Sequence, residues 1–112
     1  MEELIDMVQT ALLAFAAGVL GTNAIPHFVK GVVGEEFPNV MGNGPLPDAV
    51  AGALGLMQAV LLGYWATLPA HPWAGFAAAG AGALLMTVFH GSRGAFRVNQ
   101  RLGKPNPIAV HG

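Results

Sequence analysis

Residues 49–92 contain no Asp, Glu, Lys or Arg, and this uncharged stretch restricts the fold more than any other feature of the sequence. An α-helix rises about 1.5 Å per residue, so about 20 residues cross a hydrocarbon core of about 30 Å. The stretch is too long for one crossing and long enough for two, and a proline-containing turn, residues 69–72, divides it near its middle. It therefore predicts two transmembrane helices, residues 49–68 and 73–92, that pack as a tight hairpin.

Another apolar helix is expected before this hairpin. Residues 7–29 carry no charge, and the acidic residues just before them suit the first turn of a helix, where the helix dipole favours carboxylates. These features predict a helix over residues 3–28. Pro26 has no backbone N–H to donate, so we expect a kink or an early end of the helix near that residue.

The composition fits one membrane domain. Charged residues make up 10% of the 112 residues, against about 25% in an average soluble domain. The length suits a single domain, and the absence of cysteine excludes disulfides and thiol chemistry. We therefore expect an all-α membrane protein with three transmembrane helices, in which residues 1–112 form a single integral membrane domain.

Two segments outside these helices are more polar. Residues 31–48 are rich in Gly, Pro and Asn, which predicts a long loop with several turns. A surface connector is the simpler interpretation of this loop, and a functional or re-entrant segment is the alternative. Residues 93–112 predict a basic tail, in which Pro105 and Pro107 stop any helix and favour disorder at the end of the chain.

All basic residues fall on one side of the three-helix arrangement. Lys30 follows the first helix and the other four lie in the tail, whereas the opposite side has an acidic N-terminus and an uncharged turn. By the positive-inside rule, the N-terminus lies outside and the loop and tail lie in the cytoplasm. Membrane lipids are expected partners, the tail being held on anionic headgroups, and no nucleic-acid partner is expected.

Small residues recur at every fourth position of the second predicted helix, at Ala51, Gly55, Ala59 and Gly63. Residues four apart share one helix face, and small faces let helices approach closely in lipid. The other two helices also carry small residues, so the pattern predicts close packing without stating which helices meet. Three short helices bury little surface alone, so we expect other copies of the chain or a larger membrane complex as partners.

Seven polar residues form the candidate functional cluster: Asn23, His27, Lys30, Glu35, Glu36, Gln58 and His90. Gln58 lies near the middle of its helix, where an amide needs a hydrogen-bond partner or lines a permeation path. His27 and His90 lie at the same membrane boundary, where a bond to a carbonyl or a headgroup is the simpler interpretation. A metal ion or haem held by this pair is the alternative, and no other cofactor is predicted.

The end of the first helix has a recognisable pattern. The segment contains Asn23, Pro26, His27, Phe28 and Gly31 in the order Asn-x-x-Pro-His-Phe-x-x-Gly, followed by Phe37 and Pro38. It resembles a group of small, uncharacterised bacterial multi-pass membrane proteins with such a segment after the first helix. The resemblance covers about a fifth of the chain. It implies a bacterial inner-membrane protein with a functional loop, and it implies no activity.

Three functions from different classes are consistent with these features. The first is a non-catalytic assembly or accessory module, acting as a homo-oligomer or as a subunit of a larger membrane complex. The second is an oligomeric carrier or channel for protons, ions or small solutes, with Asn23, His27 and Gln58 on the path. The third is a cofactor or metal binder based on His27 and His90. The sequence has no recognisable catalytic motif, so an enzyme is the less favoured class.

Overall fold

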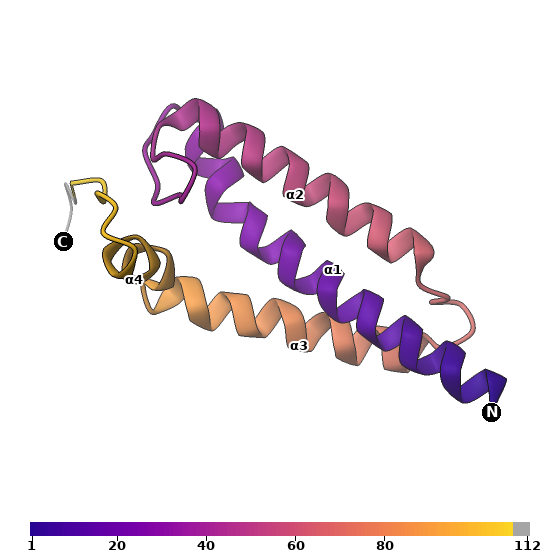
Figure 1. Cartoon of the computed structure of the whole chain (residues 1–112). Helices are drawn as coiled ribbons and strands as arrows, with labels where there is room; N and C mark the ends of the chain where they lie inside the picture. Colours follow the sequence, from indigo (N-terminus) through magenta and orange to yellow (C-terminus); the bar gives the residue numbers. More distant parts are fainter. Residues whose placement is uncertain (109–112) are drawn as a thin grey trace.

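The computed structural model describes residues 1–108, and this part of the chain is helical with no strand. Its four helices, labelled in Figure 1, are α1 (Glu2–Val32), α2 (Pro45–Trp65), α3 (Pro72–Gly91) and α4 (Gly94–Arg101). Three of them, α1, α2 and α3, are long and apolar enough to cross a membrane. The prediction of an all-helical chain with three such helices is therefore confirmed.

Two helix ends differ from the sequence-based prediction. Helix α1 passes through Pro26 and continues to Val32, so the early end expected at this proline is not observed. The last turn of α1 is held by packing, because Gly31 lies directly against Ala49 of α2. Helix α2 begins inside the predicted loop, at Pro45. Proline suits the first turn of a helix, because backbone N–H groups there have no intrahelical acceptor and the missing N–H of proline breaks no hydrogen bond.

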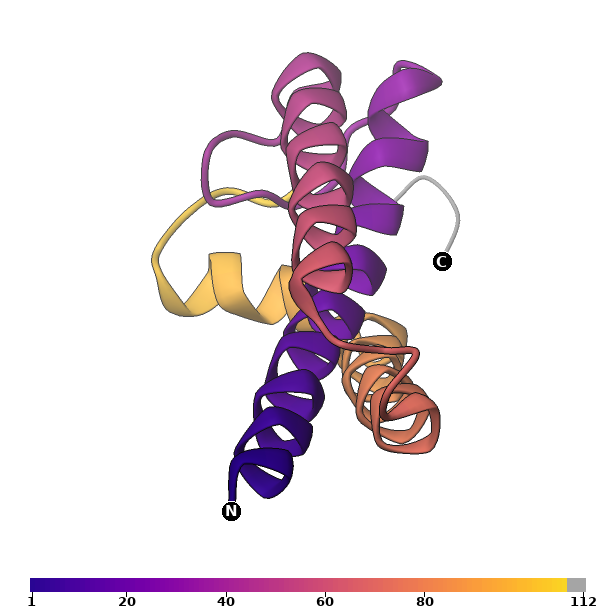
Figure 2. The same ribbon diagram turned by 90° about the vertical axis from the view of Figure 1, so that its right-hand side faces the viewer.

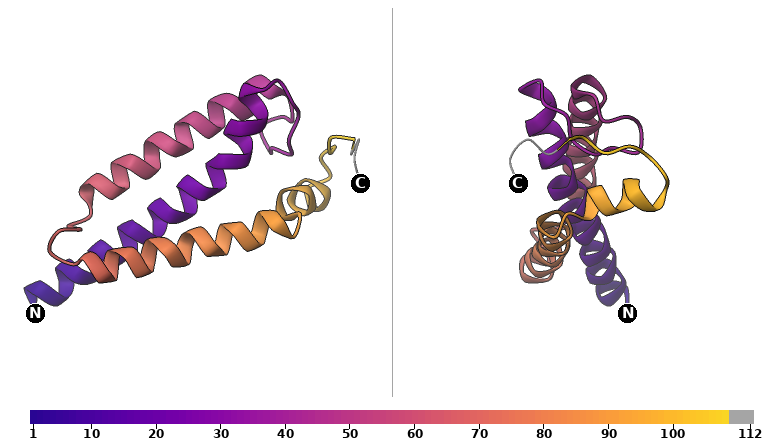
Figure 3. Two further views of the ribbon diagram at one scale, coloured as in Figure 1. Left: turned by 180° about the vertical axis from the view of Figure 1, so that it is seen from behind. Right: turned by 90° about the vertical axis from the view of Figure 1, so that its left-hand side faces the viewer.

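The predicted tight hairpin of the second and third helices is wrong. Helix α1 lies between α2 and α3 and packs against both, whereas α2 and α3 have no contact with each other in the described chain. Figures 1 and 3 show α2 and α3 on opposite sides of α1. The physical reason is that α1 offers small residues on both of its flanks, so each neighbour packs more closely on α1 than the two would on each other.

Contacts between α1 and α2 bring backbone close to backbone. An added Cβ on Gly52 would overlap the backbone of Phe28, and one on Gly55 would lie 2.9 Å from the Cβ of Ala24. Gly63, predicted to belong to the same packing face, has nothing within 4 Å of such a Cβ. The close contact with α1 therefore runs from the start of α2 to Ala59, which an added Cβ on Gly21 would approach to 3.3 Å, and does not reach Gly63.

Contacts between α1 and α3 are equally close. Gly18 lies against the Ala79 carbonyl, and Gly82 lies against the Phe15 carbonyl and the Val19 amide. A side chain at either glycine would force the two helices apart. Each flank of α1 thus depends on glycines, some of them in α1 and some in its partners.

The end of the bundle that carries the N-terminus has its own polar contacts. Asp6 accepts hydrogen bonds from Thr67 Oγ1 at 3.0 Å and from His71 Nε2 at 3.0 Å. The fully buried hydroxyl of Thr10 accepts the Thr67 backbone N–H at 3.2 Å. These bonds fasten the connection between α2 and α3 to the first turns of α1.

The opposite end carries the loop between α1 and α2 together with α4 (Figure 1). Helix α4 lies across the direction of α2 in Figure 2, and Arg93, in a left-handed conformation with φ of 64°, makes the turn between α3 and α4. The guanidinium of Arg93 lies 4.1 Å from the centre of the Phe96 ring. Part of the predicted basic tail is therefore an ordered helix, and the expected disorder at its end falls on residues 109–112, outside the described residues.

Candidate functional site: a polar pocket beside α4

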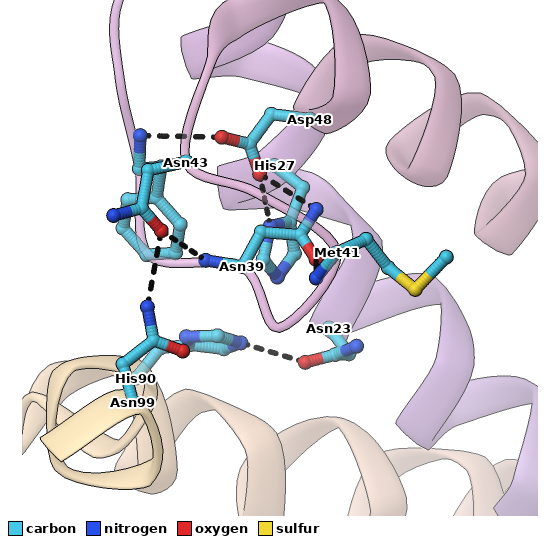
Figure 4. A network of polar contacts seen from close by, with 9 residues as sticks. Asn23, His27, Asn39, Met41, Asn43, Asp48, His90 and Asn99 are labelled. Carbon is cyan, nitrogen blue, oxygen red and sulfur yellow. Dashed lines mark hydrogen bonds and ion pairs between the residues drawn. The ribbon is translucent and has the colours of Figure 1, made fainter. Parts of the chain in front are cut away.

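A buried carboxylate organises this end of the molecule. Asp48, in the first turn of α2, has a side chain with 0% exposure. Its oxygens accept hydrogen bonds from His27 Nδ1 at 2.7 Å, Asn39 Nδ2 at 3.1 Å and the Phe37 backbone N–H at 3.2 Å (Figure 4). Because an unpaired carboxylate is costly to bury, these donors and the positive end of the α2 dipole explain how Asp48 is accommodated.

The bond to Asp48 fixes the tautomer of His27. A carboxylate oxygen only accepts, so His27 Nδ1 carries a proton, and in the neutral imidazole Nε2 presents a lone pair. His27 Nε2 has no hydrogen-bond partner among residues 1–108, and 13% of the side chain is exposed. His27 is thus a hydrogen-bond acceptor that the protein orients and leaves unused.

His90 is oriented by a second bond. Its Nε2–H donates to the Asn23 side-chain oxygen at 2.9 Å, which joins α3 to α1 (Figure 4). The other ring nitrogen, Nδ1, is buried and has no partner in the described part of the chain. The ring centroids of His27 and His90 are 6.0 Å apart, with their planes nearly perpendicular.

Aromatic rings surround the two imidazoles. The Phe37 ring lies 5.1 Å from His27 and 5.9 Å from His90, and Phe89 lies 5.0 Å from His90, all measured between ring centres. The edge-to-face arrangement of His27 on Phe37 is a favoured geometry for ring pairs. The loop therefore contributes both a backbone donor to Asp48 and an aromatic wall to the histidines.

Asparagines join the loop to α4 and the tail. The side-chain oxygen of Asn43 accepts the Asn39 backbone N–H and Asn99 Nδ2, each at 3.0 Å. Asn43 Nδ2 donates to the Pro105 carbonyl at 2.7 Å. Asn99 is only 1% exposed, so α4 is fastened to the loop by a buried side chain.

These elements enclose a pocket of about 320 Å³. Its polar lining consists of Asn23, His27, Asn39, Gln58, His90 and Asn99. The remaining lining is mainly apolar and comes from all four helices and the loop, including Leu54 of α2 and Phe89 of α3. Since α2 and α3 do not contact each other, the pocket occupies the space between them beside α1.

The structure separates the predicted polar cluster into two groups. Asn23, His27, Gln58 and His90 line the pocket. Lys30 and Glu35 instead form an exposed ion pair at 2.7 Å, and Glu36 is exposed; none of these three lines the pocket. Gln58 is itself exposed at the pocket wall and makes no side-chain hydrogen bond among the described residues.

Sequence reasoning missed the residues that support His27. Asp48 was interpreted only as the boundary of the uncharged stretch, and Asn39, Asn43 and Asn99 only as loop or tail residues. One signal was present: Asp48 stands in the short polar interval between Pro47 and a long apolar run, where a carboxylate caps or begins a helix. Nothing local in the sequence indicates that this carboxylate is buried against His27.

The predicted metal or haem at His27 and His90 stays a prediction. No group of three or more His, Cys, Asp or Glu side chains within residues 1–108 is placed to hold a metal ion. The two imidazoles would need a third ligand from elsewhere.

Comparisons with protein-family models, with curated proteins and with solved structures find no match to this chain.

Proposed function

We propose that the protein is a non-catalytic integral-membrane module that binds a small molecule in the pocket beside α4. The observation that carries this proposal is the unused acceptor His27 Nε2, held in one tautomer by Asp48 at the wall of the pocket. The volume of about 320 Å³ lies at the lower end of the range for small-molecule sites, which is about 300 to 1,000 Å³.

The pocket is preorganised for binding. Asp48, Asn39 and Asn43 hold the loop through buried or half-buried hydrogen bonds, and Asn99 holds α4 against that loop. A ligand entering such a pocket orders few additional side chains, so less of the interaction free energy is lost to entropy.

The lining favours binding over covalent chemistry. The residues that line the pocket include no Ser, Thr, Cys or Lys, the side chains that usually act as nucleophiles. Their polar groups are amides and imidazoles, which recognise a ligand through hydrogen bonds. Because Lys30, the α4 arginines and Lys104 share this end of the chain, the positive-inside rule would place the pocket at the cytoplasmic interface.

Native extraction tests the proposal. Protein taken gently from its membrane into lipid nanodiscs should carry a small molecule that mass spectrometry detects, and Val40→Trp should abolish its recovery. Val40 lines the pocket from the loop and is 46% exposed, so the larger ring has room to occupy the pocket. The matched control is Met57→Trp on α2, which is 65% exposed and does not line the pocket. Equal recovery of the same molecules from Val40→Trp and wild type would contradict the proposal.

Assembly with other copies or with a larger complex is the second candidate function. It is supported by Gly63 of α2 and Gly80 of α3, where an added Cβ would meet nothing within 4 Å. Such open small-residue positions allow close approach of another membrane helix. In blue-native electrophoresis, Gly63→Leu and Gly80→Leu should convert oligomer to monomer, whereas Leu61→Ala, on an exposed part of α2, should not. A wild-type protein that migrates only as a monomer would refute this candidate.

A further inference from the structure

His27 Nε2, at the pocket wall, lacks a hydrogen-bond partner among residues 1–108, while its ring is held in place by the bond at Nδ1. His27 Nδ1–H donates to the Asp48 carboxylate at 2.7 Å, and this charge-assisted bond fixes the orientation of the ring. Asp48 itself is fully buried behind the imidazole and already accepts three hydrogen bonds. A ligand therefore meets His27 Nε2 and not the carboxylate, and its matching group is an O–H or N–H donor.

The charges around the pocket select a neutral donor. No Lys or Arg lines the pocket, so an anionic ligand would find no cation. No Asp or Glu lines it either, because Asp48 lies behind His27 and Glu35 and Glu36 are exposed elsewhere. Burying a charge without a partner is costly, so a neutral hydroxyl suits this lining better than an ammonium or a carboxylate.

The apolar part of the lining shows where the rest of the ligand lies. Leu54 of α2 and Phe89 of α3 line the pocket from helices that do not contact each other, and Leu54 is 53% exposed. If the chain crosses the membrane as predicted, an opening between α2 and α3 would face lipid. A ligand that enters through it has an apolar body and partitions into the bilayer first.

We infer that the pocket binds a membrane-soluble alcohol or phenol, whose hydroxyl donates to His27 Nε2 and whose apolar body lies between α2 and α3. This inference rests on the proposed function, since it specifies the class of small molecule for the same pocket. Gln58, exposed at the pocket wall, is the residue placed to distinguish ligands with a second polar group.

A pair of matched probes tests this inference on the wild-type protein. The phenol 4-octylphenol and its methyl ether, 4-octylanisole, have similar size and apolarity, but only the phenol has an O–H donor. Each is equilibrated by dialysis with nanodiscs that contain the protein and with empty nanodiscs of the same lipid, and the bound amount is quantified. We expect specific binding of the phenol and about tenfold weaker binding of the ether, as for loss of one strong hydrogen bond.

Two variants add a test of the acceptor. His27→Phe keeps an aromatic ring but removes the lone pair, and should weaken phenol binding to the level of the ether. His71→Phe changes a histidine at the opposite end of the bundle, bonded to Asp6, and should leave binding unchanged. The comparison of the two probes on wild-type protein needs no variant, so it decides the question even if His27→Phe does not fold.

The outcomes separate this inference from the proposed function. Equal specific binding of phenol and ether would overturn the donor class while leaving a ligand-binding pocket. No specific binding of either probe would overturn the inference, and the recovery of a native ligand from wild type but not from Val40→Trp would still support the pocket.

Discussion

The buried carboxylate of Asp48 connects three parts of the chain that lie far apart in sequence or belong to different elements. His27 comes from α1, Phe37 and Asn39 from the loop, and Asp48 itself from α2. Each of these hydrogen bonds pairs a polar group that lipid would leave without a partner. Asp48 is therefore a main support of the loop over the pocket, together with Asn43.

Replacement of Asp48 should destabilise the fold. Asp48→Ala leaves the His27 Nδ1–H, the Asn39 amide and the Phe37 N–H without their acceptor, and leaving a buried donor unsatisfied typically costs about 1 to 3 kcal/mol. Chemical denaturation in mixed micelles, followed by circular dichroism, should show a loss of about that size. Glu35→Ala is the control, because its ion pair with Lys30 is exposed and should contribute less than about 1 kcal/mol. Equal stability of the two variants would show that Asp48 does not hold the loop.

For single residues, the sequence predicted that the histidines belong to the candidate site, but it did not predict which side chains orient them. Asn23, His27, Gln58 and His90 stand out because polar residues are rare in apolar helices, and all four line the pocket. Asp48 and the asparagines are ordinary in a polar loop, and their burial arises only when the loop folds onto α1 and α4. A short sequence pattern does not indicate such a long-range contact.

Among the elements, α1 is central because it meets both other long helices through small residues. Hydropathy and length predicted three spanning helices, since these properties belong to each helix alone. Pairing was not predictable in the same way, because all three helices carry small residues and consecutive helices are commonly neighbours. The pairing of the helices depends on the close approaches of Gly18 to Ala79 and of Gly52 to Phe28, which are seen only in the folded structure.

Leucine at these close approaches should separate the helices. Gly18→Leu places a side chain against the Ala79 carbonyl of α3, and Gly52→Leu places one against the Phe28 backbone of α1. Overpacking of this kind typically costs about 1 to 3 kcal/mol or more, and backbone atoms cannot move aside as side chains do. Both variants should lose thermal stability in micelles relative to Gly91→Leu, because an added Cβ at Gly91 meets nothing within 4 Å. A similar loss in Gly91→Leu would mean that the loss does not come from these close approaches.

In the whole molecule, the acidic N-terminus and the basic residues lie at opposite ends of an elongated shape. The chain is elongated, 52 Å by 22 Å by 22 Å, and its acidic N-terminus lies at the end opposite to the loop and α4. The basic residues of α4 and the tail are exposed at the far end, where anionic headgroups would meet them. The orientation expected from the sequence, with this end in the cytoplasm, stays a prediction.

Single cysteines test that orientation, and the sequence supplies a background without any cysteine. A cysteine at Ala70, in the connection between α2 and α3, should react with a membrane-impermeant maleimide added to intact cells. A cysteine at Gly42, in the loop beside the pocket, should react only after the membrane is permeabilised. Labelling of both positions from the same side would refute a three-crossing arrangement.

The proposed binding requires that the protein hold His27 in one tautomer with a free acceptor in the pocket, and nitrogen NMR observes this directly. The chain has four histidines, so ¹⁵N-imidazole labelling in bilayers gives few signals, and His27→Phe assigns those of His27. We expect a protonated Nδ1 and an unprotonated Nε2 for His27 in wild type, and loss of this fixed tautomer in Asp48→Asn. A protonated Nε2, or two tautomers in exchange in the wild-type protein, would contradict it.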